Sequence, residues 1–372
     1  MVLLPEAWSY YPGRVALNYR TSGIFAPEST NTTRKIDMRK ITNSMIHPEL
    51  RKTGIVFRII LPYFKLSTFR KCNCLLRFLK GKCGRDMRYD QAFIPRVYPD
   101  PESLRLCIYR PKWAREKAPG ILWMHGGGYG LGVPEQDEGF IRDFVNRFGC
   151  TVISPDYRLS VDLPYPAALE DCYAAFLWMK DHADKLNIRD DQLMVGGDSA
   201  GGGLAAALAI YARDKGEAAI AFQMPLYPMI DDRMITGSSR DNDASVWNTK
   251  SNVTGWKSYL GELYGTNDVP AYAAPARLED YSSLPPAFTY VGSVEPFRDE
   301  TIDYMEKLKA AGIPADYRVF DGCYHGFDIV APKSEPAREA RKLLGSAFAY
   351  AKENYFAEQP ESRLELKHDL PD

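Results

Sequence analysis

The segment GDSAG at residues 197–201 constrains the fold of this chain most strongly, because it joins a strand-like run to a helix-like run. Residues 192–195 precede it and residues 204–210 follow it. In a G-x-S-x-G elbow the flanking glycines allow a sharp turn, and the serine is lifted above the edge of a sheet. The N-terminus of the next helix then offers N–H groups to a developing oxyanion. Taken alone, the segment is equally compatible with a Gly-rich loop in which Ser199 caps a helix.

A second glycine-rich segment, HGGGYG at residues 125–130, follows the apolar run 120–124. An oxyanion hole needs inward-pointing N–H groups without obstructing side chains, and consecutive glycines supply them. Gly126 and Gly127 are the predicted donors of this loop, and Ala200 is the third. The alternative is a flexible glycine loop. A phosphate-binding loop is disfavoured, because the chain has neither G-x-x-x-x-G-K-[ST] nor G-x-G-x-x-G in a βαβ setting.

The chain has five histidines from which a general base could come. His47 and His368 lie in terminal segments, His182 lies on a predicted helix surface, and His125 belongs to the glycine loop. His325 follows the strand-like run 315–320 and comes after the serine in the order expected for an α/β sheet enzyme, namely serine, acid, histidine. We therefore expect His325 to be the base.

The acid of the same site is expected between the serine and the histidine, just after a strand. Residues 288–292 form that strand, and Glu295 is the first carboxylate after it. Asp299 falls about one turn into the following helix, where it would point along the helix, so Glu295 is favoured. Its role would be to hold the imidazole tautomer and stabilise the imidazolium. The alternative for Glu295 is an acid that only complements a helix dipole.

Strand-like and helix-like segments alternate along most of the chain. Strands are predicted at residues 104–109, 121–125, 151–154, 192–195, 221–224, 288–291 and 315–320. Helices are predicted at residues 138–148, 167–185, 201–214, 299–311 and 335–353. This alternation indicates an α/β fold with a mostly parallel, doubly wound sheet.

Six motifs occur in the order found in one known family. They are HGGGYG, DYRL at 156–159, PAALED at 166–171, GDSAG, EPFRDE at 295–300 and YHGF at 324–327. Together they resemble the hormone-sensitive-lipase-like family of α/β-hydrolases, and within it the GDSAG branch of small carboxylesterases. The resemblance covers residues 95–355. One position departs from the family pattern: the family usually has D-P-L-R-D-E where this chain has Glu295.

The resemblance implies an α/β-hydrolase fold with a helical cap and a serine esterase that needs no metal or organic cofactor. Ser199, Glu295 and His325 would be the triad, and Gly126, Gly127 and Ala200 the oxyanion hole. Tyr129 and Asp198 would orient the loop or touch substrate. Esters with acetyl to butyryl groups are the expected substrates, by resemblance alone.

Two other functions are alternatives to that of an esterase. One is a ligand-binding receptor on an inactive hydrolase scaffold, since fold does not fix function. Receptors of this family have lost the catalytic histidine, whereas this chain keeps both Ser199 and His325. The other is a lipase acting at a membrane surface, which would use the same triad.

The length of 372 residues suits one catalytic domain with additions. We expect the core at residues 95–228 and 273–356, with 229–272 as a cap insertion in which residues 246–247 and 256–260 are helical. Residues 1–94 would contribute to the cap, and residues 357–372 would form a flexible tail.

Charge is unevenly distributed along the chain. Residues 1–90 hold 17 Lys/Arg and 6 Asp/Glu, although the whole chain has a net charge of −1. Between residues 69 and 88 basic side chains alternate with leucine and phenylalanine, as in helices that lie on anionic membranes. A cap helix with a solvated basic side is the favoured interpretation, and no nucleic-acid partner is expected.

Other sequence features bear on location and assembly. The N-terminus lacks a charged n-region and a sustained apolar h-region, so a signal peptide is not predicted. The apolar run 53–64 is too short to span a bilayer. The seven cysteines suggest neither a disulfide framework nor a zinc site. A cytoplasmic protein that acts on a small ester is predicted; a homodimer stays open, because no interface signature is evident.

Overall fold

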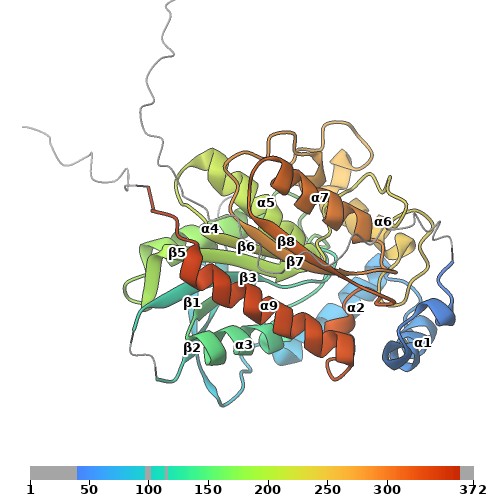
Figure 1. The fold of residues 1–372 in the computed structure, drawn as a ribbon, viewed down its shortest axis with the longest axis horizontal. Coiled ribbons are helices and arrows are strands. Elements are labelled where there is room, and N and C mark those ends of the chain that lie inside the picture. Colours follow the sequence, from blue (N-terminus) through green and yellow to red (C-terminus); the bar gives the residue numbers. More distant parts are fainter. Residues whose placement is uncertain (1–39, 97–101, 114–115, 361–372) are drawn as a thin grey trace, which may run out of the picture.

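The fold was analysed in a computed structural model, which describes residues 40–96, 102–113 and 116–360 (Figure 1). The predicted tail beyond residue 360, and the N-terminal 39 residues of the predicted cap segment, lie outside the described residues. None of the helices described combines the length and the apolar character needed to cross a bilayer.

An eight-stranded sheet forms the centre of the molecule in the order β1-β2-β4-β3-β5-β6-β7-β8. The first two strands pair antiparallel, β2 pairs antiparallel with β4, and all later pairs are parallel. The predicted mostly parallel sheet is therefore confirmed. The strands are β1 (Met87–Pro95), β2 (Ser103–Pro111), β3 (Ala118–Met124), β4 (Thr151–Pro155), β5 (Ile188–Asp198), β6 (Phe222–Leu226), β7 (Ala287–Gly292) and β8 (Ala315–Phe320).

Helices cover both faces of this sheet (Figure 1). One face carries α3 (Glu138–Phe148) and α9 (Glu335–Asn354), whose apolar sides share one buried cluster. The other face carries α4 (Ala167–Asp181), α5 (Ala200–Lys215) and α7 (Arg298–Ala310). Because both faces are covered, every residue of β3, β4, β6 and β7 is buried. These strands accordingly lack the regular apolar–polar alternation of a half-exposed sheet, and β3 is apolar throughout.

Three further helices gather beyond one end of the sheet: α1 (Arg51–Ile60), α2 (Leu66–Leu76) and α6 (Thr249–Leu260) (Figure 1). The N-terminal helices and the insertion touch each other here: the N–H of Phe64 donates to Ser251 Oγ at 3.0 Å. Asn248, the N-cap of α6, also donates through Nδ2 to the carbonyl of Pro62 at 2.7 Å. Segments far apart in the sequence thus form one layer over the sheet edge. A short helix, α8 (Phe327–Val330), follows β8.

Two expectations about these outer parts were wrong in detail. The strand β1 was not predicted, and the expected boundary at residues 94 and 95 cuts across it. In addition, residues 246–247 are not helical, because Val246 has a φ of 70° and α6 begins only at Thr249. A β-branched residue with positive φ is strained, so tertiary contacts must impose this conformation.

Close packing of α5 against β3 generates a first prediction. A Cβ on Gly201 would overlap the carbonyl oxygen of Met124 at the end of β3. Gly201→Ala should therefore lower the free energy of unfolding by about 1–3 kcal/mol or more. Gly237→Ala is the matched control, since its Cβ would meet only Asp299 Oδ2 at 3.4 Å. Urea unfolding of both variants checks this, and equal stabilities would contradict it.

Candidate active site

Ser199 stands at the junction between β5 and α5, in a conformation that the sequence motif predicts. Its φ of 55° and ψ of −117° are unfavourable for a residue with a side chain. The glycines on either side allow the turn, because a Cβ on Gly197 would overlap the carbonyl oxygen of Met124. The turn places the Ser199 side chain at the carboxyl edge of the parallel strands, where α/β enzymes carry their sites.

His325 and Glu295 lie beside Ser199 in one line of hydrogen bonds. The hydroxyl of Ser199 is 2.8 Å from His325 Nε2, and His325 Nδ1 is 2.5 Å from Glu295 Oε2. Glu295 also accepts the N–H of Gly292 through Oε1 at 2.7 Å, which fixes its carboxylate at the end of β7. Glu295 is completely buried. With Nδ1 donating to the carboxylate, Nε2 is free to take the serine proton.

The alternative acid, Asp299, is engaged elsewhere. Its carboxylate accepts the N–H of Ser238 at 2.8 Å and pairs with Arg298 at 2.7 Å. Asp299 begins the first turn of α7 and serves the inserted segment that contains Ser238. The geometry therefore favours Glu295 as the partner of His325.

Gly126 does not fit the donor role that was expected of it. Its N–H donates to Asp198 Oδ1 at 3.0 Å, so this hydrogen is already used. Within the described residues, the N–H groups of Gly127 and Gly128 have no acceptor at hydrogen-bond distance. The N–H of Ala200, in the first turn of α5, is one of the groups that a helix leaves without an intrahelical partner. Gly127, Gly128 and Ala200 are thus the donors available to an oxyanion.

The buried carboxyl groups of Asp198 and Asp137 lie next to the glycine loop and help to fix it. Asp198 contacts Asp137 through a side-chain hydrogen bond, and Asp137 Oδ2 also accepts Trp123 Nε1–H at 2.9 Å. Burial raises the pKa of Asp137 to about 6 and that of Asp198 well above its ordinary value. The negative charge of Asp137 adds to the effect of burial in raising the pKa of Asp198, because neighbouring carboxylates disfavour each other's ionisation.

The carbonyl of Gly126 is fixed as firmly as its N–H. Gln136 Nε2 donates to this carbonyl at 3.1 Å, and His125 Nδ1 lies 2.8 Å from it. His125 stacks on Tyr157 with ring centroids 4.2 Å apart, and burial lowers its pKa to about 4. A neutral His125 therefore has the structural role that the sequence suggested. Both backbone polar groups of Gly126, one in each of the two peptide units that it joins, are held before any substrate arrives.

Tyr129, expected next to the chemistry, has a structural position in the loop. Its hydroxyl donates to the carbonyl of Met229 at 2.7 Å, and its ring stacks on Tyr259 of α6 with centroids 3.8 Å apart. Its φ of 62° follows two glycines that also have positive φ. Tyr129 thereby connects the glycine loop to the insertion above it.

Aromatic side chains from the outer layer close over the site. Trp247 of the insertion packs so closely on Gly128 that a Cβ there would overlap the indole, and its ring lies 6.3 Å from that of His325. Phe69 of α2 stacks parallel to Trp247 at 6.3 Å. Only 4% of Ser199 and 5% of His325 are exposed, so this conformation leaves little access to the catalytic groups.

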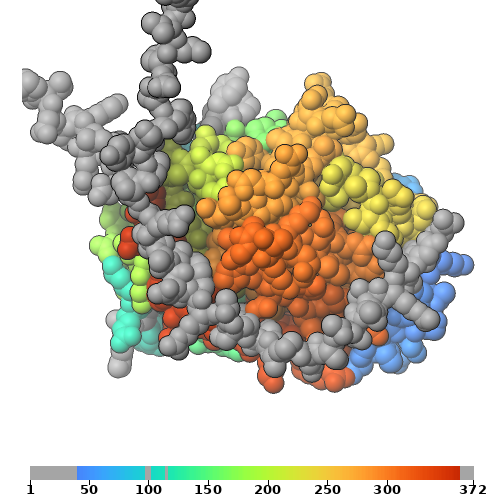
Figure 2. All heavy atoms as spheres, turned by 45° about the horizontal axis from the view of Figure 1, so that its top comes forward, coloured from blue at the N-terminus to red at the C-terminus, as the bar shows by residue number. Residues whose placement is uncertain are grey.

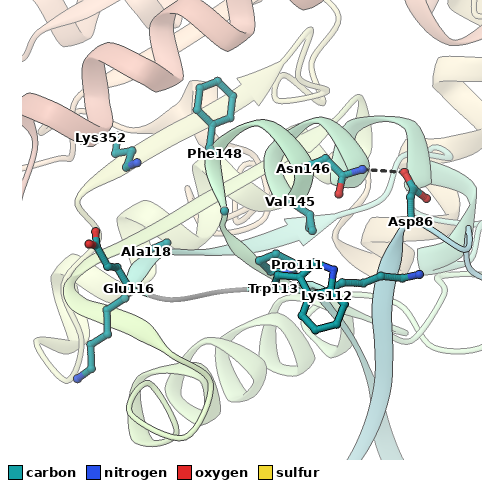
Figure 3. Close-up of a pocket in the computed structure, with 12 residues that line it drawn as sticks. Asp86, Pro111, Lys112, Trp113, Glu116, Ala118, Val145, Asn146, Phe148 and Lys352 are labelled. Atoms are coloured by element: carbon teal, nitrogen blue, oxygen red, sulfur yellow. Dashed lines mark hydrogen bonds between the residues drawn. The ribbon is translucent and has the colours of Figure 1, made fainter.

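A separate hollow of about 570 Å³ lies at the opposite, amino edge of the parallel strands (Figure 3). It is bounded by the end of β2 at Pro111 and the start of β3 at Ala118. Asn146 donates to Asp86 across it at 2.7 Å. Its described lining contains no serine, cysteine or histidine, so it offers no nucleophile with a base.

The fold and this arrangement of serine, histidine and carboxylate define an α/β-hydrolase. Comparison with known families agrees with this class. A family model described as alpha/beta hydrolase fold matches residues 121–329, and the chain belongs to this family. The resemblance to the hormone-sensitive-lipase-like branch is confirmed.

Several esterases are similar to this chain. Esterase LipI of Mycobacterium tuberculosis is 36% identical over 236 residues, which are 63% of this chain and 73% of the relative. Carboxylesterase NlhH of the same organism is 31% identical over 236 residues, 62% of this chain and 74% of the relative. Among solved structures, a bacterial heroin esterase matches with a TM-score of 0.76 at 30% identity, over 84% of this chain and 99% of that one.

Sequence reasoning missed Asp137, Gln136 and Trp247. The first two belong to a short turn of helix, η4 (Pro134–Asp137), that follows the glycine loop within ten residues. Their proximity to HGGGYG was a usable signal, because polar side chains close to a glycine loop can hold its backbone. Trp247 gave no comparable signal, since its place depends on the folding of a long insertion.

The buried carboxyl pair generates a second prediction. The pKa of Asp137 is higher in the folded protein than its ordinary value of 3.8. The folded state therefore binds more protons, and the stability from this group is present below pH 4 and lost as the pH rises through about 6. Asp137→Asn cannot ionise. Between pH 4 and 7 the unfolding free energy of the wild type should therefore fall more than that of Asp137→Asn. The difference between the two decreases should be on the order of 2 kcal/mol.

Urea unfolding at several pH values measures this difference. Asp268→Asn, at an exposed carboxylate in a loop, is the matched control and should follow the wild type. The same pH dependence in Asp137→Asn and the wild type would contradict the raised pKa of Asp137.

Proposed function

We propose that this chain is a serine carboxylesterase that hydrolyses short-chain acyl esters through a covalent acyl-enzyme. The observation that carries the proposal is the unbroken line of hydrogen bonds from Ser199 through His325 to Glu295. Its family and its esterase relatives make the chain a carboxylic ester hydrolase. The acyl length and the roles of individual residues are the further content of the proposal.

The first half of the reaction forms the acyl-enzyme. Ser199 Oγ attacks the ester carbonyl carbon while its proton passes to His325 Nε2. Glu295 stabilises the imidazolium through Nδ1–H and stays ionised. The tetrahedral intermediate collapses as Nε2–H protonates the leaving alcohol, which departs with the original serine proton.

The second half releases the acid. His325 takes a proton from water, the resulting hydroxide attacks the acyl carbon, and the same proton returns to Ser199 Oγ as the carboxylic acid leaves. The oxyanion of both tetrahedral intermediates would accept hydrogen bonds from Gly127, Gly128 and Ala200. Asp198 and Gln136 act as positioning residues, because they hold the Gly126 peptide that precedes the donors.

Two observations support small acyl groups. Trp247 occupies the space directly over Gly128, and Phe69 reinforces the indole from α2. The catalytic groups are almost completely covered in this conformation. A long acyl chain would have to displace these packed rings, whereas an acetyl or butyryl group adds few atoms. We assign residues 40–94 and 229–272 to the cap that sets this limit. The part of the first range that forms β1 belongs to the sheet and not to the cap. A cytoplasmic location and a homodimer stay predictions.

The receptor alternative predicts that the protein does not turn over esters. A receptor on this scaffold would bind its ligand without hydrolysis. We expect hydrolysis of p-nitrophenyl esters that is fastest for acetyl to butyryl and falls toward dodecanoyl. Ser199→Ala should lose at least about 10³-fold in kcat. A well-folded protein with no turnover at any chain length would favour the receptor.

Exchange of the two candidate acids separates their roles. Glu295→Gln should lower kcat by about 10³- to 10⁴-fold, because the amide cannot stabilise the imidazolium and favours the wrong histidine tautomer. Asp299→Asn, the matched control, should keep kcat within a few-fold of the wild type. Steady-state kinetics on p-nitrophenyl acetate measures both. A larger loss in Asp299→Asn than in Glu295→Gln would transfer the acid role to Asp299.

A further inference from the structure

The two N-terminal helices carry an unusual concentration of positive charge. Residues 51–85 contain ten Lys/Arg and no Asp/Glu. This range includes all of α1 and α2 and the short helix η3 (Arg77–Leu79). The inner faces of both helices pack on the body of the protein, so the question is what their outer faces contact.

The outer face of α1 is apolar. Ile59 and Ile60 are 75% and 76% exposed, and Val56 one turn earlier is 51% exposed. Lys52 lies one further turn back on the same side, since residues four apart in a helix are neighbours. Figure 2 shows α1, in blue, at the lower right edge of that view. An apolar stripe with a lysine at its end therefore projects from the molecule.

The outer face of α2 and η3 combines apolar and basic side chains. Lys71, Leu75 and Phe78 follow each other at helical spacing, and Leu75 and Phe78 are 69% and 72% exposed. Arg70 and Arg77 form a neighbouring exposed stripe with the same spacing. Cationic heads beside exposed apolar side chains are typical of helices that lie at a membrane interface.

Most of this charge is not neutralised by the protein. Lys80 pairs with Asp156 at 2.6 Å, and Arg58 donates to backbone carbonyls of residues 41 and 243. In the described part of the chain, no carboxylate lies within ion-pair distance of the other exposed basic side chains. These are Lys52, Lys65, Arg70, Lys71, Arg77, Lys82 and Arg85.

We propose that the outer faces of α1, α2 and η3 dock this protein on an anionic phospholipid surface. Exposed isoleucine, leucine and phenylalanine would enter the headgroup and acyl boundary, and the unpaired cations would meet lipid phosphates. Each basic residue near such a surface contributes separately to binding, and the sum rises with the number of cations. A neutral apolar partner would leave the seven cations unmatched, which favours the anionic surface.

On their inner sides, the same helices pack against residues next to the candidate active site. Gly54 of α1 packs against Tyr324, the neighbour of His325, and a Cβ there would lie 2.9 Å from the Tyr324 ring. Phe69 of α2 supports Trp247 above Gly128. A hollow of about 560 Å³ separates the start of α2, at Lys65 and Leu66, from α6. Docking would place this hollow near the lipid surface.

Vesicle flotation with the full chain tests the proposal without any need for catalysis. The wild type should float with phosphatidylcholine vesicles that contain phosphatidylglycerol and remain unbound with phosphatidylcholine alone. Binding to the anionic vesicles should fall in about 1 M NaCl, where screening is strong. Arg70→Glu/Lys71→Glu should lower partitioning by about tenfold or more. Ile59→Glu/Phe78→Glu should also lower it, because the apolar anchors are lost.

Matched controls change the same chemistry elsewhere on the surface. Lys215→Glu/Lys342→Glu makes the same change in net charge at the end of α5 and on an exposed position within α9, and Trp113→Glu removes an exposed aromatic residue at the opposite sheet edge. Both controls should float like the wild type. Circular dichroism confirms that each variant is folded.

Three results would overturn the proposal. The first is that the wild type does not float with anionic vesicles. The second is that the helix variants float as well as the controls do. The third is a dimer in sedimentation velocity that Ile59→Glu/Phe78→Glu converts to a monomer, which would assign the face to a second copy of the chain.

A consequence for activity rests on the proposed esterase function: an ester carried in anionic vesicles should be hydrolysed faster by the wild type than by Arg70→Glu/Lys71→Glu. Hydrolysis of water-soluble p-nitrophenyl acetate should be equal.

Discussion

The strained backbone of Ser199 is the constraint on which the site depends, and three hydrogen bonds hold it. The N–H of Ser199 donates to the carbonyl of Leu226 at 2.9 Å, which ties the turn to β6. Its carbonyl accepts the N–H of Gly203 at 2.9 Å and the N–H of Met229 at 3.0 Å. A residue in an unfavourable φ/ψ region persists only where its surroundings fix it in this way. Because β6, the loop after it and α5 supply these bonds, the position of Ser199 is set by the sheet and the helix that follows it.

The same principle extends to the rest of the site, where buried polar groups replace water in holding each catalytic part. Glu295 is fixed at Gly292, and the Gly126 peptide is held on one side by Asp198 and on the other by Gln136. A preorganised site avoids reorganisation during the reaction, which is why such hydrogen bonds contribute strongly to catalysis. The cost is electrostatic, because burial raises the pKa of both Asp137 and Asp198 and so disfavours their charged forms.

The central parts of this site could be predicted from sequence because they are locally encoded. The elbow and the chain order of Ser199, Glu295 and His325 follow from short motifs between predictable elements, although the glycine spacing alone left a helix-capping loop as an alternative. The donor role of Gly126 could not be predicted correctly, because it depends on which neighbouring side chain captures one N–H. Only the approach of β5 to β3 brings Asp198 to that group.

The outer layer shows where sequence patterns cease to be sufficient. The strand β1 was missed because it is an edge strand that has a polar stretch near its start and buries only Met87 and Ile94. Residues 246–247 were predicted as helix, yet Val246 takes a positive φ as contacts bring Trp247 onto Gly128. The expectation that the basic stretch covers the site with its apolar side stays a prediction, since Leu75 and Phe78 are exposed. The exposed leucine and phenylalanine became interpretable only once the inner and outer faces were known.

The central claim is that Ser199 is a nucleophile activated by His325, and covalent labelling tests it most directly. Diethyl p-nitrophenyl phosphate should transfer its diethylphosphoryl group to Ser199 Oγ and release one p-nitrophenolate per chain. Mass spectrometry of the digested protein should then place a single adduct on the peptide that contains Ser199, and His325→Ala should prevent its formation. An adduct on another residue, or none in a preparation that hydrolyses esters, would contradict the account.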